Sequence, residues 1–168
     1  MSDFPSLQPA MTVRVVADSP MQIGGATGTP LAIVPMTSGT IKTEPGFAPA
    51  LDAELHGVGY DYIHNDSSGE NMRLDVRAQV KNNDGTLLAM YYKGTVALTD
   101  GVKALLTGDP NAGTTPYGDS FTTFNFETGN PAYKALENGT YVSAGHFIKE
   151  PGQEGIIVEY KVSKVIKG

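Results

Sequence analysis

Apolar and polar residues alternate strictly along residues 72–81. Every second position is apolar, and the positions between them hold arginine, aspartate, glutamine or lysine. A period of two predicts a β-strand with one buried face and one polar face. Asp84-Gly85 separates this run from a second β-rich run that ends near Leu98, and Asp-Gly at such a position is a strong hairpin signal. We expect the chain to be organised around this hairpin, residues 71–98.

Further β-rich runs predict strands on both sides of the hairpin. The Gly-Val-Gly segment 57–59 interrupts one of them as a break or a bulge. Two segments have the caps and apolar spacing of short helices, residues 99–106 and 132–137. The remaining strands are expected at residues 11–17, 30–41, 51–56 with 60–64, 120–126, 140–149 and 155–166.

About eight or nine strands with turns between them predict an all-β protein, either an antiparallel barrel or a sandwich. We favour a single up-and-down barrel of the lipocalin or streptavidin type. Closure leaves no exposed edge strand, and about eight strands enclose a cavity that fits one small ligand. The 168 residues are expected to form one domain, with residues 1–9 as a flexible N-terminal segment.

The net charge of the chain limits the classes of partner that it is expected to bind. A net charge of −6 and a pI of about 4.9 argue against nucleic acid and against an anionic membrane surface. No apolar run reaches the roughly 20 residues that span a bilayer, and the first ten residues lack the basic and apolar regions of a secretion signal. We expect a cytoplasmic protein. Assembly into a homo-oligomer, either a dimer or a tetramer, is left open.

Neither a metal nor a cofactor is expected. The chain has no cysteine, and His56, His64 and His146 do not have the spacing of a common metal site. The glycine-rich segment 23–28 is followed by a strand-like run, whereas a phosphate-binding loop needs a helix at that point. Catalysis would therefore depend on ordinary side chains.

Carboxylates are the best candidates for such catalysis. Asp75 and Arg77 share one face of the first hairpin strand, and Asp61 lies between two tyrosines. Alternation alone favours a solvent-facing position for Asp75 and Arg77, because lipocalin-type barrels are dry inside. A carboxyl group inside an apolar barrel would have a raised pKa, and it could then act as an acid or a base near neutral pH.

Six short motifs occur in an order that is typical of one family. They are Ser38-Gly39-Thr40-Ile41, Gly57-Val58-Gly59-Tyr60-Asp61-Tyr62, Leu74-Asp75-Val76-Arg77, Asp84-Gly85-Thr86-Leu87-Leu88, Lys93-Gly94 and Phe126-Glu127-Thr128-Gly129-Asn130-Pro131-Ala132-Tyr133. From about Thr12 to Val165 the chain resembles the domain-of-unknown-function 3237 family. That family reads approximately G-G-T-F, G-G-x-D-W, L-D-x-R-Y, D-G-x-x-I, N-x-G and F-E-T-G-D-x-x-Y.

This resemblance implies a small antiparallel barrel without a cofactor. Some fungal relatives in aromatic polyketide pathways look like cyclases that close an oxygen ring onto an alkene. The matching polar positions imply that Asp75 and Arg77 face inward, against the pattern of alternation alone. The chain departs from the family where Tyr62 and Ala135 replace tryptophan, where Ala78 replaces an aromatic residue, and where residues 121–123 lack an arginine. We therefore expect a wider and differently charged pocket.

The favoured hypothesis is a cofactor-independent enzyme that cyclises a small aromatic or polyketide-type molecule by intramolecular hydroalkoxylation of an alkene. The predicted catalytic residues are Asp61, Asp75, Arg77 and Glu127, and the predicted substrate-binding residues are Tyr60, Tyr62, Tyr92, Phe124 and His146. The main alternative is a lipocalin-like protein that binds a small molecule without chemistry. A third interpretation is a hydrolase or isomerase that uses His146 or His56.

Overall fold

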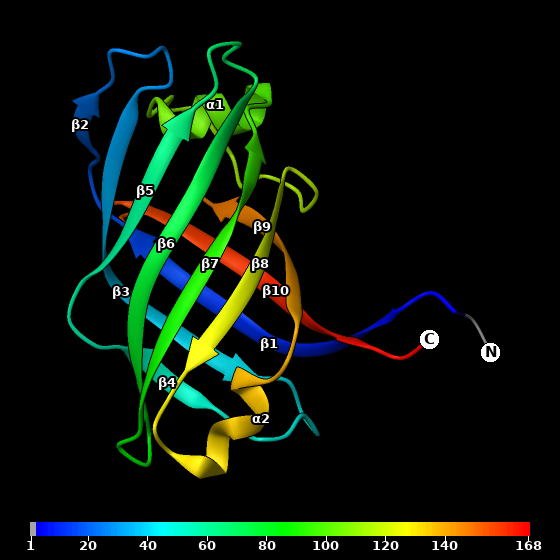
Figure 1. Cartoon of the computed structure of the whole chain (residues 1–168). Coiled ribbons are helices and arrows are strands. Elements are labelled where there is room, and N and C mark those ends of the chain that lie inside the picture. Colours follow the sequence, from blue (N-terminus) through cyan, green and yellow to red (C-terminus); the bar gives the residue numbers. More distant parts are fainter. Residues whose placement is uncertain (1–2) are drawn as a thin grey trace.

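The fold is a closed antiparallel β-barrel. A computed structural model describes residues 3–168, and within them ten strands form one sheet (Figure 1). The strands are β1 (Ser6–Ala17), β2 (Met21–Gly24), β3 (Leu31–Thr43), β4 (Asp52–Leu55), β5 (Gly59–Asn65), β6 (Asn71–Asn82), β7 (Leu87–Ala97), β8 (Ser120–Glu127), β9 (Tyr141–Ile148) and β10 (Ile156–Ile166). The helices are α1 (Asp100–Leu106), η1 (Pro131–Tyr133) and α2 (Lys134–Glu137). The predicted fold class is confirmed.

The barrel closes at β1, which pairs with β10 on one side and with β3 on the other. From β6 to β10 each strand pairs with the next along the chain. β4 and β5 lie one after the other between β3 and β6. The result is a barrel of eight strand positions, with further strand segments outside that count.

The hairpin of β6 and β7 forms as the alternation predicts. Gly85 supplies the turn with a φ of +88°, and Asp75 pairs with Lys93 across the two strands. The apolar residues of β6 are buried in the barrel, so Asp75 and Arg77 lie on its outer face. The expectation that these two side chains face inward is wrong. The side-chain period of a strand is two, and burying Val76 between them forces both outward.

Two other details differ from the expectations. β1 begins at Ser6, and residues 6–9 pair with the end of β10 where a flexible segment was expected (Figure 1). The part of that prediction concerning Met1 and Ser2 lies outside the described residues. The short exposed strand β2 was not predicted. The interruption expected near Gly57 is present, since β4 ends at Leu55 and β5 begins at Gly59.

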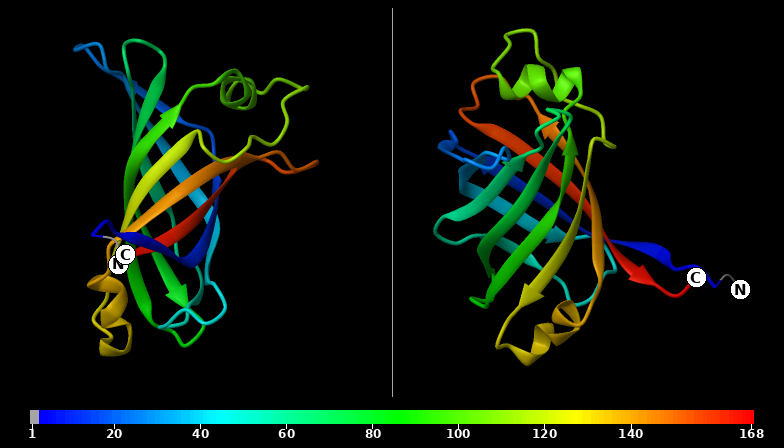
Figure 2. Two further views of the ribbon diagram at one scale, coloured as in Figure 1. Left: turned by 90° about the vertical axis from the view of Figure 1, so that its right-hand side faces the viewer. Right: turned by 45° about the horizontal axis from the view of Figure 1, so that its top comes forward.

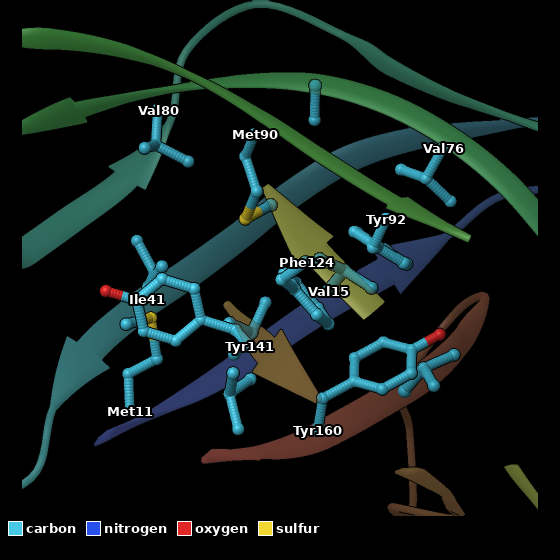
Figure 3. Close-up of a cluster of buried hydrophobic side chains, with 14 of the residues drawn as sticks. Met11, Val15, Ile41, Val76, Val80, Met90, Tyr92, Phe124, Tyr141 and Tyr160 are labelled. Atoms are coloured by element: carbon cyan, nitrogen blue, oxygen red, sulfur yellow. The ribbon is translucent and has the colours of Figure 1, made fainter. Parts of the chain in front are cut away.

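The two ends of the barrel are filled differently. The end near α2 is packed with large side chains such as Ile41, Met90 and Tyr141, which are nearly inaccessible to solvent (Figure 3). Leu136 of α2 is fully buried there. α1 lies over the opposite end, and the two views in Figure 2 show the helices at opposite ends of the strands.

Asn82 connects the end of β6 to the segment that closes the barrel near α2. Its side chain is buried, and its Oδ1 accepts a hydrogen bond of 2.9 Å from the backbone N–H of Asp52. Its Nδ2 donates to the Tyr133 hydroxyl at 2.7 Å, and that hydroxyl donates to Asp84 at 2.6 Å. Breaking such a buried polar network lowers stability, because a donor or acceptor that loses its partner has lost its hydration without gaining a hydrogen bond.

We predict that Asn82→Ala lowers the free energy of unfolding by about 2 kcal/mol, because it leaves the Asp52 amide and the Tyr133 hydroxyl without this partner. Urea denaturation followed by circular dichroism measures the change. Asn83→Ala is the matched control, since Asn83 is exposed. Equal stability of the two variants would contradict the role given to Asn82.

Candidate functional site

A cavity of about 270 Å³ occupies the end of the barrel beneath α1. Most of its lining is apolar and comes from nearly every strand position of the barrel. The lining residues are Val15, Ala17, Asp18, Pro20, Gln22, Ala32, Val34, Met36, Asp61, Ile63, Asn65, Met72, Leu74, Tyr92, Leu106, Phe147, Ile156, Val158 and Tyr160. Concave apolar sites with a few polar groups are typical of small-molecule binding.

Asp61 is the charged group deepest in this cavity. It lies on β5 with 8% of its surface exposed, between Val34 of β3 and Val76 of β6 in the strand pairing. Burial raises the pKa of its carboxyl group from 3.8 to about 7, although a hydrogen bond from the backbone N–H of Asp75 partly opposes the increase. The negative charge of the Asp75 side chain adds to the increase. Asp61 can therefore hold or release a proton near neutral pH.

Two buried tyrosines share the cavity with Asp61. The rings of Tyr92 on β7 and Tyr160 on β10 meet edge to face at a centroid distance of 5.1 Å, and the Tyr92 hydroxyl donates to Met36 Sδ at 3.4 Å. Burial raises the pKa of both phenols, and the nearby Asp61 charge raises both further. Both phenols therefore remain protonated near neutral pH and can donate a hydrogen bond. Phe124 stacks on Tyr92 at 4.4 Å and supports it from β8.

The mouth of the cavity carries three polar side chains, Asp18, Gln22 and Asn65. Leu106 of α1 covers part of the opening. No lysine, arginine or histidine is found among the described residues that line the cavity. An anionic ligand would meet two carboxyl groups and no countercharge there, so the lining favours a neutral or cationic molecule.

Most other predicted site residues lie on the outside of the barrel, so their predicted positions in the pocket are wrong. Tyr60 and Tyr62 are 39% and 43% exposed, because Asp61 between them takes the inward position. Glu127 lies on the outer face of β8 and accepts a hydrogen bond of 2.6 Å from the Tyr91 hydroxyl. Asp75 and Arg77 share this outer surface, where Arg77 lies 5.4 Å from the centre of the Tyr91 ring.

His146 also lies outside the cavity. It stacks on Tyr117 at a ring distance of 3.9 Å beneath the loop that follows α1. Its Nδ1 is 2.9 Å from the carbonyl oxygen of Thr115, and its Nε2 is 3.5 Å from Glu159. The neighbouring residue Phe147 takes the inward position on β9 and lines the cavity instead.

The structure thus brings Asp61 and Tyr92 together in the cavity, and Phe124 packs behind Tyr92. Sequence reasoning missed Tyr160, although its spacing of two from Val158 and Val162 is a signal that it shares their buried face. The polar residues of the mouth carried no comparable signal, since they come from loop and strand-end positions. In residues 3–168, no group of three or more His, Asp or Glu side chains is placed to bind a metal ion.

The raised pKa of Asp61 makes the stability of the protein depend on pH. A carboxyl group that titrates at about 7 when folded and 3.8 when unfolded favours the folded state while it is protonated. That contribution, about 4 kcal/mol, is lost as the pH rises from about 4 to about 8. We predict that Asp61→Asn removes this loss and is more stable than the wild type at the alkaline end. Urea denaturation across this pH range measures it.

Asp52→Asn is the control for this measurement, because Asp52 is exposed and makes an ion pair with Lys42 on the outer surface. Its stability should keep the pH dependence of the wild type. If Asp61→Asn and the wild type showed parallel profiles, the carboxyl group of Asp61 would have an ordinary pKa in the folded state.

Comparison with known proteins adds a family and several structures of the same fold. The model of the family described as "Protein of unknown function (DUF3237)" matches residues 5–165. Among curated proteins, no match is found. In the part of the chain that the structure describes, no helix is long and apolar enough to cross a bilayer.

Solved structures from bacteria and a fungus share the barrel. A conserved protein of unknown function from Rhodopseudomonas palustris is 17% identical with a TM-score of 0.79, covering 98% of this chain and 100% of its own. A beta-barrel like protein from Acinetobacter baumannii AYE is 22% identical with a TM-score of 0.73, covering 98% of both chains. An enzyme from Penicillium herquei is 15% identical with a TM-score of 0.60, covering 98% of this chain and 97% of its own. At these identities the likeness shows the fold.

Proposed function

The chain belongs to the DUF3237 family of proteins of unknown function, and on this premise we propose that it is a cofactor-independent enzyme. It binds a small, neutral, aromatic molecule in the barrel and uses Asp61 as its proton donor and acceptor. The observation that carries this proposal is the placement of Asp61, a buried carboxyl group with a pKa of about 7 inside an apolar cavity. Such a group costs stability, which is typical of a residue retained for chemistry.

The proposed reaction is the closure of a cyclic ether. The carboxyl group of Asp61 gives its proton to one carbon of an alkene, so the π bond breaks and the other carbon becomes a cation. The oxygen of a phenol in the same molecule forms a C–O bond to that carbon, and its proton returns to the Asp61 carboxylate. The product is an isomer of the substrate, so the reaction needs no oxidant or reductant. Holding the oxygen beside the alkene supplies part of the rate.

The cavity limits the size and polarity of the substrate. Its volume of about 270 Å³ is less than twice that of a cavity of about 150 Å³ that holds benzene. One aromatic ring with a short branched side chain fits this space. The hydroxyl groups of Tyr92 and Tyr160 are the donors that would orient the phenol oxygen, and the apolar wall would exclude water from the cation.

The fungal structure gives this proposal support at the level of the fold. The protein from Penicillium herquei is an enzyme, so a barrel of this fold carries catalysis in at least one case. The alternative function, a lipocalin-like binding protein, draws on the same apolar cavity. The two functions differ in what the loss of the Asp61 proton does, because binding to a carrier requires no proton transfer.

We predict that the pure protein converts an ortho-prenylated phenol, in which ethyl replaces one terminal methyl group, into a cyclic ether enriched in one enantiomer. Asp61→Asn should reduce turnover at least about 100-fold, since general acid catalysis contributes that much, while calorimetry shows that the variant still binds the phenol. The wild-type rate should fall about tenfold per pH unit above about pH 7, because the protonated fraction of Asp61 falls. Chiral chromatography of the product provides the measurement.

Glu127→Gln is the control variant, because Glu127 lies on the outer face of the barrel. Its turnover and product ratio should equal those of the wild type. Tight binding of the phenol with racemic product at the uncatalysed rate would favour the binding protein over the enzyme.

A further inference from the structure

We propose that Asp75 positions the Asp61 carboxyl group through its backbone N–H, and that the ion pair of Asp75 and Lys93, on the outside of the barrel, sets the acid strength of Asp61 across a gap in the hydrogen-bonded ladder. This inference rests on the proposed function, because it concerns the same acid. It assigns a task to residues that do not touch the cavity. Asp75 and Lys93 are positioning residues in this scheme, and Asp61 is the catalytic residue.

The gap lies in the hydrogen-bonded ladder between β5 and β6. These strands pair on both sides of it in one constant register, with Tyr60 opposite Arg77 and Asp61 opposite Val76 at one end, and His64 opposite Arg73 at the other. Two pairs are missing from the ladder between these points, those that would join Tyr62 to Asp75 and Ile63 to Leu74. The ladder is therefore interrupted directly after the pair of Asp61 and Val76.

The carboxyl group of Asp61 occupies the position that the ladder leaves open. Its Oδ1 accepts a hydrogen bond of 3.0 Å from the backbone N–H of Asp75. That N–H would otherwise face the backbone of Tyr62 in the same register. A buried N–H needs a partner, so the bond satisfies the Asp75 amide and fixes the direction of the Asp61 carboxyl group. Asp61 is thus held by the main chain of the residue whose side chain faces outward.

The Asp75 side chain brings a charge close to Asp61 from the other side of the wall. Its Oδ2 lies 3.2 Å from Lys93 Nζ, and the two residues pair directly across β6 and β7. The carboxylate disfavours ionisation of Asp61, whereas the ammonium group of Lys93 offsets this effect. The outer pair therefore acts as two opposed charges on one buried acid.

Other groups also face Asp61 or lie near its part of the wall. The groups inside the cavity do not form an ion pair with it. The groups on the cavity side are Tyr92 of β7, Tyr160 of β10 and, at the mouth, Asp18. The charged groups on the outer face of the wall are Arg73, Asp75 and Arg77 of β6 and Lys93 of β7. Arg73 makes its ion pair with Asp66, at 2.8 Å, and Arg77 lies over Tyr91. Among these groups, Asp75 both binds Asp61 through its amide and raises the pKa of Asp61 through its charge.

The test is a titration of the Asp61 carboxyl carbon by NMR in the unliganded protein, with the signal assigned by its loss in Asp61→Asn. Asp75→Asn keeps the backbone N–H and removes the charge, so we expect the pKa of Asp61 to fall by roughly half a unit to one unit. Lys93→Met leaves the Asp75 carboxylate without its partner, so we expect the pKa of Asp61 to rise. General damage to the fold would not move the two variants in opposite directions.

Two control variants belong to this test. Lys93→Arg keeps the positive charge and should restore the wild-type titration. Asp52→Asn removes a carboxylate from another exposed ion pair, that with Lys42, and should leave Asp61 unchanged. Circular dichroism confirms that each variant is folded.

The outcomes separate this inference from the proposed function. Suppose that the wild-type Asp61 titrates near 7, and that Asp75→Asn and Lys93→Met each shift its pKa no further than Asp52→Asn does. The role of the outer pair is then overturned, while Asp61 remains the proposed acid. A shift in the same direction in both variants would also overturn that role. If the wild-type Asp61 titrates at its ordinary value, both the inference and the proposed function fail.

Discussion

Closure of the sheet through the two partners of β1 is the constraint on which the rest of the structure depends. In a closed barrel every strand has one face inside, so inward positions from all strands compete for one interior. Large side chains such as Tyr141 and Met90 fill this interior near α2. Space remains beneath α1, where the lining includes Val15, Ala32 and Val34 beside larger residues such as Tyr92 and Tyr160. The cavity therefore lies at the end of the barrel that α1 covers and not at the end that α2 fills.

Within that interior, the carboxyl group of Asp61 is buried among mainly apolar side chains. An ionised carboxylate loses its hydration there and gains one backbone hydrogen bond, that of Asp75, as compensation. The imbalance is resolved by proton uptake, which is why its pKa rises to about 7. The same burial that destabilises the folded protein at alkaline pH makes the group a usable acid. Stability and chemistry are therefore coupled at this residue, and they oppose each other.

The sequence predicts the barrel well because its alternation reports burial directly. β6 shows how far this goes, since the period of two places Val76 inside and Asp75 and Arg77 outside. The period of two also holds on β5, but there it does not tell which face is inside, since the bulkier Tyr60 and Tyr62 beside Asp61 would be expected to be the buried residues. The structure reverses this, because the register of β5 against β3 and β6 turns Asp61 inward. A short strand beside a break has too few apolar positions to specify its own face.

The outward position of Asp75 shows that whether a residue belongs to a site and where its side chain points are two separate questions. A residue can contribute to a site through its backbone while its side chain points away, as the Asp75 amide does for Asp61. The resemblance of Leu74-Asp75-Val76-Arg77 to a family motif implied an inward orientation, whereas Asp75 contacts Asp61 through its backbone and its side chain faces outward. Successive side chains of a strand point to opposite faces of the sheet, so alternation indicates which side chains are buried. Participation depends on what the whole residue contacts, and here the contact crosses the wall where the β5–β6 ladder is open.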